Sequence, residues 1–208
     1  MTLLLRKMNS SEKIVITNIK HASKGRSFIY ADGEYLLSMP TELVVKSRIR
    51  KGLEISQEHL SELLFKTEFY KVKEKALNIL SYRAHSRGEL EFKIKDGFSE
   101  EVVCAVLDNL EESSLLNDEN FAKDYACYLY RSKGYAVKRI KLELKNKKID
   151  SETIAKIIDD LELDEISNLE RIIEKKRFKN LEDKKLKQRA LSYLMRLGYS
   201  WDQINSCL

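Results

Sequence analysis

One helical pattern occurs three times in the C-terminal two-thirds of the chain, and it constrains the fold more than any single residue does. In each copy a bulky apolar residue stands directly before a Ser or an Asp, at Phe98-Ser99, Ile149-Asp150 and Tyr199-Ser200. A Ser or Asp at this place caps the free N–H groups of a helix start, and the apolar residue before it can pack against the fourth helical position. Apolar residues then follow at the spacing of a helix with one buried face. These stripes are Val103, Val106, Leu107 and Leu110, then Ile154, Ile157, Ile158 and Leu161, then Ile204, Cys207 and Leu208.

The spacing of the copies predicts three tandem repeats of three helices each. The caps lie 51 and 50 residues apart, and a regular period of this kind is typical of helical repeat proteins. In the first repeat, Ser86 and Glu89 have the spacing of a capping box at the start of a preceding helix. A single repeat could not bury its apolar stripe alone, so we expect the repeats to stack into a curved helical array. The predicted repeats are residues 66–116, 117–163 and 164–208.

Residues 1–65 have a different pattern, which predicts a small α/β module. Two β-like segments, residues 14–20 and 27–31, are followed by Asp32-Gly33, a dipeptide typical of a two-residue hairpin turn. We expect a three-stranded antiparallel sheet with short helices after it. The predicted fold class is therefore mainly α, with tandem three-helix repeats preceded by a small α/β module that contains a short antiparallel sheet.

No catalytic, metal or cofactor site can be assembled from the motifs. The seven glycines are scattered singly, so a glycine-rich loop that could cradle a phosphate is absent. His21, His59 and His85 lie apart from the cysteines and lack the spacing of metal ligands. His85 stands beside Ser86, but the glycine elbow of a serine nucleophile is missing. We therefore predict that the protein is not an enzyme and holds no metal or cofactor.

The apolar and cysteine patterns predict a cytoplasmic protein without membrane contact. The longest apolar runs, such as residues 102–107, are far shorter than the roughly 20 residues needed to cross a bilayer. Residues 1–5 precede Arg6 and Lys7, which is the reverse of the charge order in a secretory signal. The three cysteines are odd in number and sit among apolar helical positions, so we expect free, buried thiols in a reducing compartment.

Basic residues are segregated along the chain, although the formal net charge is only +5. Residues 167–208 contain ten basic against five acidic residues, and residues 71–118 contain seven against ten. The densest stretch, residues 131–148, has eight basic residues and a single acid, with three tyrosines inside it or just before it. Because Lys and Arg displace counterions from phosphates and tyrosine rings can stack on bases, the stretch indicates contact with nucleic acid. The alternative is that these cations merely solvate the outer face of a helix.

Several short motifs stand out in the helical region. They are Ala76-Leu77 with Arg83, Ser86-x-x-Glu89-Leu90, Gly97-Phe98-Ser99, Leu116-Asn117-Asp118 with Phe121-Ala122, Gly134 before Arg139-Ile140 and Glu143-Leu144, and Leu197-Gly198-Tyr199-Ser200. Together they cover about residues 70–208 and resemble the RecX family, the regulators of the bacterial RecA recombinase. Lys148 departs from the pattern, because the other two copies have Gly97 and Gly198 at this place. The N-terminal module resembles an extension that some members carry.

The resemblance implies a monomeric, non-enzymatic modulator that lies in the groove of the RecA filament on single-stranded DNA. Such proteins restrain the filament's ATP hydrolysis, strand exchange and co-protease activity. Charge clustering, rather than the resemblance, selects the residues that we predict to face the nucleoprotein filament. These candidates are Arg83, Arg87, Arg131, Lys133, Lys138, Arg139, Lys141, Lys145 and Arg189.

Two other functions fit the same sequence. A helical repeat protein could bind DNA directly and have no recombinase partner, and its affinity for bare DNA would then fall steeply with salt. A protein-interaction scaffold could use its charges only for solubility, and charge reversal at Arg139 and Lys141 would then change no binding.

Overall fold

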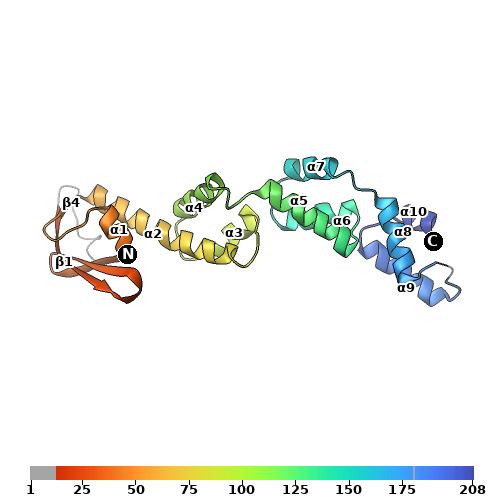
Figure 1. Cartoon of the computed structure of the whole chain (residues 1–208), viewed down its shortest axis with the longest axis horizontal. Helices are drawn as coiled ribbons and strands as arrows, with labels where there is room; N and C mark the ends of the chain where they lie inside the picture. The colour runs from red at the N-terminus through yellow and green to blue at the C-terminus, as the bar shows by residue number, and fades with distance from the viewer. Residues whose placement is uncertain (1–12, 180) are drawn as a thin grey trace. The chain divides into compact units, whose positions relative to one another are not determined.

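The computed structural model describes residues 13–179 and 181–208 (Figure 1). These residues form two compact parts. The N-terminal part contains residues 13–81 and 94–109, and the C-terminal part contains residues 82–93 and 110–208. The charge order at residues 1–7, on which the expected absence of a secretory signal depends, lies outside the described residues. None of the described helices is long and apolar enough to cross a membrane.

The N-terminal part contains an antiparallel sheet of four strands in the order β3-β2-β1-β4. Asp32 and Gly33 both have positive φ, 48° and 87°, as a tight hairpin between β2 and β3 requires. The short antiparallel sheet is confirmed, but the prediction of three strands was wrong. The fourth strand has only two residues, Glu54 and Ile55, too few to show an alternating pattern in the sequence. The strands are β1 (Ile14–Ala22), β2 (Arg26–Ala31), β3 (Glu34–Pro40) and β4 (Glu54–Ile55), with a 3₁₀ turn, η2 (Ser23–Gly25), between β1 and β2.

A long helix, α2 (Gln57–Leu80), links this sheet to a later helix, α4 (Glu100–Glu112). At its start Leu60 and Leu63 share the sheet's core, together with residues of the short helix α1 (Thr41–Lys46). Further along, the Lys73 Nζ donates to Asn109 Oδ1 over 2.6 Å, and the Ser99 N–H donates to Glu68 Oε1 over 2.7 Å. The helix continues through residues 65 and 66, where we predicted a boundary, since no Gly or Pro interrupts residues 53–87.

The C-terminal part contains two three-helix layers with separate cores, in addition to the short helix α3. Ala126, Ile140 and Ile154 lie in the first core, whereas Leu169 and Ile204 lie in the second. A π-helical turn, η3 (Leu129–Lys133), follows α5 directly and ends at Gly134, which has a φ of 70°. The helices are α3 (Arg87–Ile94), α5 (Asp118–Tyr128), α6 (Val137–Asn146), α7 (Ser151–Asp160), α8 (Glu165–Lys176), α9 (Lys184–Arg196) and α10 (Trp201–Cys207).

The three copies of the sequence pattern are the helices α4, α7 and α10, as predicted. The Asp150 carboxylate accepts from the Thr153 N–H over 2.8 Å, and the Ser200 hydroxyl accepts from the Gln203 N–H over 3.2 Å. Ser200 and Gln203 form a complete capping box. The apolar stripe of α4 is buried along its whole length, so the caps and stripes correctly located these helices.

Two glycines show how neighbouring layers of the C-terminal part fit together. A Cβ on Gly198, in the turn before α10, would lie 2.7 Å from the Arg139 Cβ on α6. In the turn before α7 the glycine is replaced by Lys148, which keeps the left-handed conformation with a φ of 64°. There the glycine lies on the facing helix instead, since a Cβ on Gly88 of α3 would overlap the Lys148 Cβ. The missing glycine before α7 therefore has its counterpart on α3.

The expected burial of the three thiols was wrong. All three are free, but Cys104 is exposed, and Cys127 and Cys207 are partly buried. Cys104 directly follows Val103, the first residue of the α4 stripe. One step along a helix turns a side chain by about 100°, which moves it away from the buried face.

Candidate nucleic-acid interface

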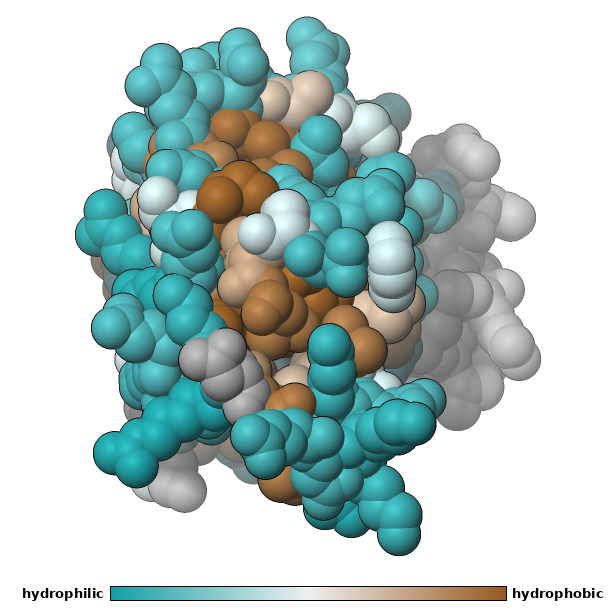
Figure 2. Space-filling view, turned by 90° about the vertical axis from the view of Figure 1, so that its right-hand side faces the viewer, coloured by the Kyte–Doolittle hydropathy of each residue, from teal (hydrophilic) through white to brown (hydrophobic). Residues whose placement is uncertain are grey.

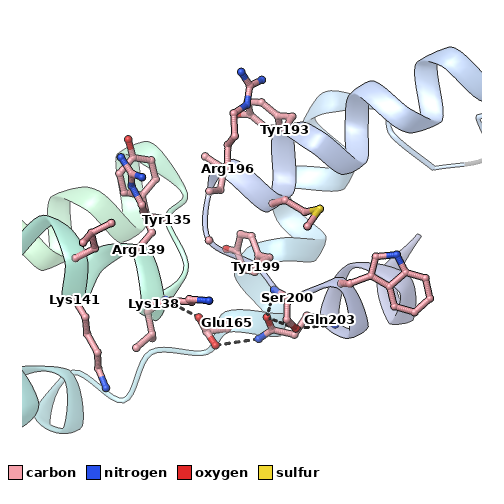
Figure 3. Close-up of a pocket in the computed structure, with 16 residues that line it drawn as sticks. Tyr135, Lys138, Arg139, Lys141, Glu165, Tyr193, Arg196, Tyr199, Ser200 and Gln203 are labelled. Atoms are coloured by element: carbon pink, nitrogen blue, oxygen red, sulfur yellow. Dashed lines mark hydrogen bonds between the residues drawn. The ribbon is translucent and has the colours of Figure 1, made fainter.

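A wide groove lies where α6 meets α9 and α10. It has a volume of about 1060 Å³, and we call it the junction groove (Figure 3). Lys138, Arg139 and Lys141 contribute to it from α6, and Arg196 contributes from the end of α9. The four cations of the groove therefore come from helices that are about 50 positions apart in the sequence.

Glu165, the acid that lines the groove, connects α6 and α10 by hydrogen bonds. Its Oε1 accepts from the Val137 N–H at the start of α6 over 2.6 Å, and its Oε2 accepts from Gln203 Nε2 of α10 over 3.0 Å (Figure 3). A carboxylate at a helix N-terminus is stabilised by the free N–H groups there. The Ala136 N–H also donates to the Leu197 carbonyl oxygen over 2.9 Å. The three elements that shape the groove are thus held together by backbone and side-chain hydrogen bonds.

Arg139 forms one wall of the groove rather than a free charge. Its Nη2 lies 2.6 Å from Glu143 Oε1, and its guanidinium carbon lies 5.6 Å from the centre of the Tyr135 ring. Figure 3 shows the Tyr135 and Arg139 side chains beside each other on the same side of the groove. The absence of a Cβ at Gly198 gives Arg139 the space for this position.

Apolar and aromatic side chains lie among the cations. Leu142, Met195 and Trp201 are 47%, 53% and 57% exposed, and all three line the groove. Figure 2, which views the chain from the side of α8, α9 and α10, shows an apolar strip bordered by hydrophilic side chains. Exposed apolar groups at this density are typical of surfaces that bind a partner.

Tyr199 lines the same groove but is buried, and its hydroxyl accepts from Asn168 Nδ2 over 3.0 Å. Burial raises the pKa of Tyr199 well above its ordinary value. The side chain therefore stays protonated at physiological pH and supports the groove as an uncharged group.

A second concavity, of about 200 Å³, lies beside the first, and Tyr193 lines both. Arg131 and Lys133 line it from η3, together with Arg171, Lys175 and Lys176 from α8. We call it the basic hollow. No acidic residue of the described chain lines it.

The nine predicted cations thus fall into four groups. Lys138, Arg139 and Lys141 come together in the junction groove, and Arg131 and Lys133 come together in the basic hollow. Arg83 and Arg87 are held in ion pairs, with Glu89 at 3.1 Å and with Glu111 at 2.6 Å. Lys145 and Arg189 are exposed and line neither the groove nor the hollow.

The Arg83 pair belongs to a small charged cluster around Glu89. Arg83 donates to both carboxylate oxygens, over 3.2 and 3.1 Å, and Lys147 Nζ donates to Oε1 over 2.6 Å. Burial acts to raise the pKa of Glu89, but the hydrogen bonds and charges of Arg83 and Lys147 outweigh it and lower the pKa to about 2. Glu89 therefore holds α3 against the end of α6.

Neighbouring polar groups in this region also have structural partners. The Ser86 hydroxyl donates to the Lys147 carbonyl oxygen and accepts from the Glu89 N–H over 3.2 Å. His85 Nδ1 lies 2.9 Å from the Arg83 carbonyl oxygen, and burial lowers the pKa of the imidazole. Neither contact joins His85 to Ser86. Within the described ranges, no group of three or more His, Cys, Asp or Glu residues could hold a metal ion.

Several residues of the groove were not among the sequence-based candidates. Arg196 and Trp201 lie outside the basic stretch at residues 131–148, and the sequence-based candidates did not include Tyr193. Arg171 and Lys175 belong to the basic segment 167–208, but the sequence does not show that they meet Arg131. Arg196 and Trp201 stand on either side of the third cap, and this position is a sequence signal that identifies them.

The fold and the groove define a class of protein built from three-helix repeats, with cationic and aromatic side chains gathered where one repeat meets the next. Family models of the first, second and third three-helix domains of RecX match residues 73–110, 117–157 and 163–208. The chain belongs to the RecX family.

Individual relatives agree with this assignment. The chain is 31% identical to "Regulatory protein RecX" of Clostridioides difficile (strain 630), over 93% of this chain and 94% of that protein. It is 30% identical to the protein of the same name from Bacillus subtilis (strain 168), over 93% of this chain and 75% of that protein.

Two crystal structures share the fold. One of a regulatory protein RecX has a TM-score of 0.69 at 21% identity and covers 93% of this chain and 99% of that chain. RecX from Lactobacillus salivarius has a TM-score of 0.57 at 26% identity, over 67% of this chain and 94% of that one.

Proposed function

We propose that the protein is a non-enzymatic regulator of DNA recombination and repair. It binds the RecA filament on single-stranded DNA and lowers the filament's ATP hydrolysis, strand exchange and co-protease activity. Membership of a family whose proteins are named regulatory supports the regulatory role. The observation that carries the proposal is the junction groove, in which four cations surround exposed apolar and aromatic side chains.

The mixed chemistry of the groove favours a nucleoprotein over bare DNA. Lys138 and Lys141 are exposed and can reach phosphates. Leu142 and Met195 offer flexible aliphatic surface, which suits a protein partner better than a sugar–phosphate chain. A surface that contacts both protein and DNA would bind a RecA filament more tightly than it binds RecA or DNA alone.

The test is the rate of ATP hydrolysis by RecA on single-stranded DNA, with the protein added below stoichiometry. We expect a lower rate with the parent protein and a weaker effect with Lys138→Gln/Lys141→Gln. The matched control, Lys51→Gln/Lys123→Gln, also removes two exposed charges, but neither lines the groove, and it should act like the parent. An unchanged rate at every ratio of parent protein to RecA would rule out the proposal.

Direct binding to bare DNA is a second candidate, favoured by the cations of the basic hollow. Binding to one labelled oligonucleotide, with and without RecA, separates the two. A filament regulator binds the coated strand more tightly, whereas a direct DNA-binding protein binds the bare strand at least as well.

A further inference from the structure

The basic hollow gathers charge of one sign, and no acid is among the described residues that line it. Its five cationic side chains come from η3 and α8, and none of them makes an ion pair with a described residue. Lys133 Nζ lies 5.6 Å from the centre of the Tyr128 ring, and Lys176 Nζ lies 5.7 Å from the centre of the Tyr193 ring. These rings stabilise the two ammonium groups without neutralising them.

Helix-end electrostatics explains only part of this cluster. Lys175 and Lys176 lie in the last turn of α8, where cations stabilise the exposed carbonyl groups. Arg131 and Lys133 likewise lie in the last turn of η3, whereas Arg171 lies more than a turn before the end of α8 and has no such explanation. Bringing these charges together is unfavourable unless an anion is bound.

The Arg171 guanidinium is held in place in a way that suits the binding of an anion. Its Nη2 donates to Asn168 Oδ1 over 2.6 Å and to the Arg131 carbonyl oxygen over 3.3 Å. Asn168 is itself buried and held by Tyr199. The contacts fix the guanidinium group, cover a carbonyl oxygen that would repel an anion, and leave Nη1 and Nε without a partner in the described chain.

The shape of the hollow depends on a close approach between η3 and α8. Gly134 is left-handed, and a Cβ there would lie 2.6 Å from Ile172 Cδ1. A glycine thus lets the turn that carries Arg131 and Lys133 pack directly on the face of α8 that carries Arg171. The resulting volume of about 200 Å³ is large enough for a phosphate group and too small for a nucleotide with its base and sugar.

We propose that the basic hollow is a subsite for one backbone phosphate of single-stranded DNA, held by Arg131, Lys133, Arg171 and Lys175. This inference rests on the proposed function for its source of phosphate. The hollow and the junction groove share Tyr193. A strand with one phosphate in the hollow would therefore have its next nucleotides directed toward the groove.

The test uses the full chain, a fluorescein-labelled oligo(dT) and no RecA. Arg131→Gln/Lys175→Gln removes two side chains that make no hydrogen bond or ion pair with a described residue. If the variant neutralises one phosphate fewer than the parent, its slope of log affinity against log salt should be shallower by roughly 0.7. The ratio of the parent's DNA affinity to the variant's DNA affinity should therefore fall by about fivefold between 0.1 and 1 M salt.

Three further measurements keep the result interpretable. Arg131→Lys/Lys175→Arg keeps both charges and should retain the parent slope, as should the control Lys51→Gln/Lys123→Gln. Pyrophosphate should raise the melting temperature of the parent but not of Arg131→Gln/Lys175→Gln. Far-UV circular dichroism should show that all variants are folded.

Two results would overturn the proposal. An unchanged DNA slope with a lost pyrophosphate effect would mean that the hollow takes free phosphates and not the DNA backbone. No change in either measurement would mean that it is not an anion site. Because RecA is absent from these experiments, a failed filament regulation would leave their outcome unaffected.

Discussion

At the scale of single residues, Glu89 shows how strongly one side chain can connect separate segments. It lies on α3 and accepts hydrogen bonds from Arg83 before that helix and from Lys147 after α6. The sequence predicted Glu89 as the second half of a capping box, and it predicted Arg83 as a filament contact. A sequence does not show whether a charged residue pairs within the fold or binds a partner, because its ion-pair partner can be distant along the chain.

The low pKa of Glu89 predicts a specific pH dependence of stability. The folded pKa of about 2 lies below the ordinary value of 4.5, so the contribution is present above pH 4.5 and lost as the pH falls toward 2. Glu89→Gln should cost about 2 kcal/mol of unfolding free energy at pH 7, after allowance for partial exposure. Urea unfolding at pH 7 and at pH 3 should show parent and variant converging at the lower pH.

Glu119→Gln is the control for this prediction. Glu119 pairs with Lys156, but both side chains are more than half exposed, so little stability should be lost. A difference between parent and Glu89→Gln that persisted unchanged at pH 3 would contradict the assignment.

At the scale of elements, a helix or strand could be predicted when the residues that specify it lie within that element. Caps and stripes lie within one helix, so α7 and α10 could be located to within a residue from Asp150 and Ser200. The two-residue strand β4 exists only because β1 provides its partner, and no local pattern shows this. The predicted boundary between residues 65 and 66 falls inside α2, where no helix-breaking residue stands.

A double-mutant cycle tests the contact between Gly88 and Lys148. Gly88→Ala should cost about 1–3 kcal/mol, because its Cβ overlaps the Lys148 Cβ. In a Lys148→Gly background the same change should be neutral or stabilising, since alanine favours a helix over glycine. Urea unfolding of the four proteins gives the coupling energy, and a cost that is equal in both backgrounds would exclude the contact.

Two adjacent isoleucines of α7 test the direction of its buried face. Ile157 is 2% exposed, whereas Ile158 is only partly buried. Ile157→Ala should cost about 2–5 kcal/mol and Ile158→Ala clearly less. Equal losses in urea unfolding would mean that α7 is rotated relative to its neighbours.

At the scale of the whole molecule, the sequence located a basic segment but not the geometry of the surface that it forms. The basic stretch at residues 131–148 does contribute to both concavities. It could not show that Arg139 is held by Glu143, or that Arg196 joins Lys138 across a boundary between repeats. Such groupings follow from the packing of α6 on later helices, and a charge count along the chain does not contain that information.

The two compact parts predict separate unfolding transitions. The single tryptophan, Trp201, lies in the C-terminal part, so its fluorescence reports on that part, whereas far-UV circular dichroism reports on both. Leu63→Ala removes a side chain from the core of the N-terminal part and should lower the circular dichroism midpoint in urea without moving the fluorescence midpoint. A common shift of both midpoints would show that the chain unfolds as one cooperative unit.

In the two contacts between layers, the glycine and the larger side chain lie on opposite sides, and this arrangement limits how such a chain can evolve. Gly88 faces Lys148 in one contact, and Arg139 faces Gly198 in the other. If the segment carrying Arg139 and Lys148 were duplicated in tandem, a lysine and an arginine would compete for the same space. If that segment were deleted, two glycines would face each other across a void. The order of the segments is therefore encoded in their contacts, and insertion or loss of one would require compensating changes on both sides.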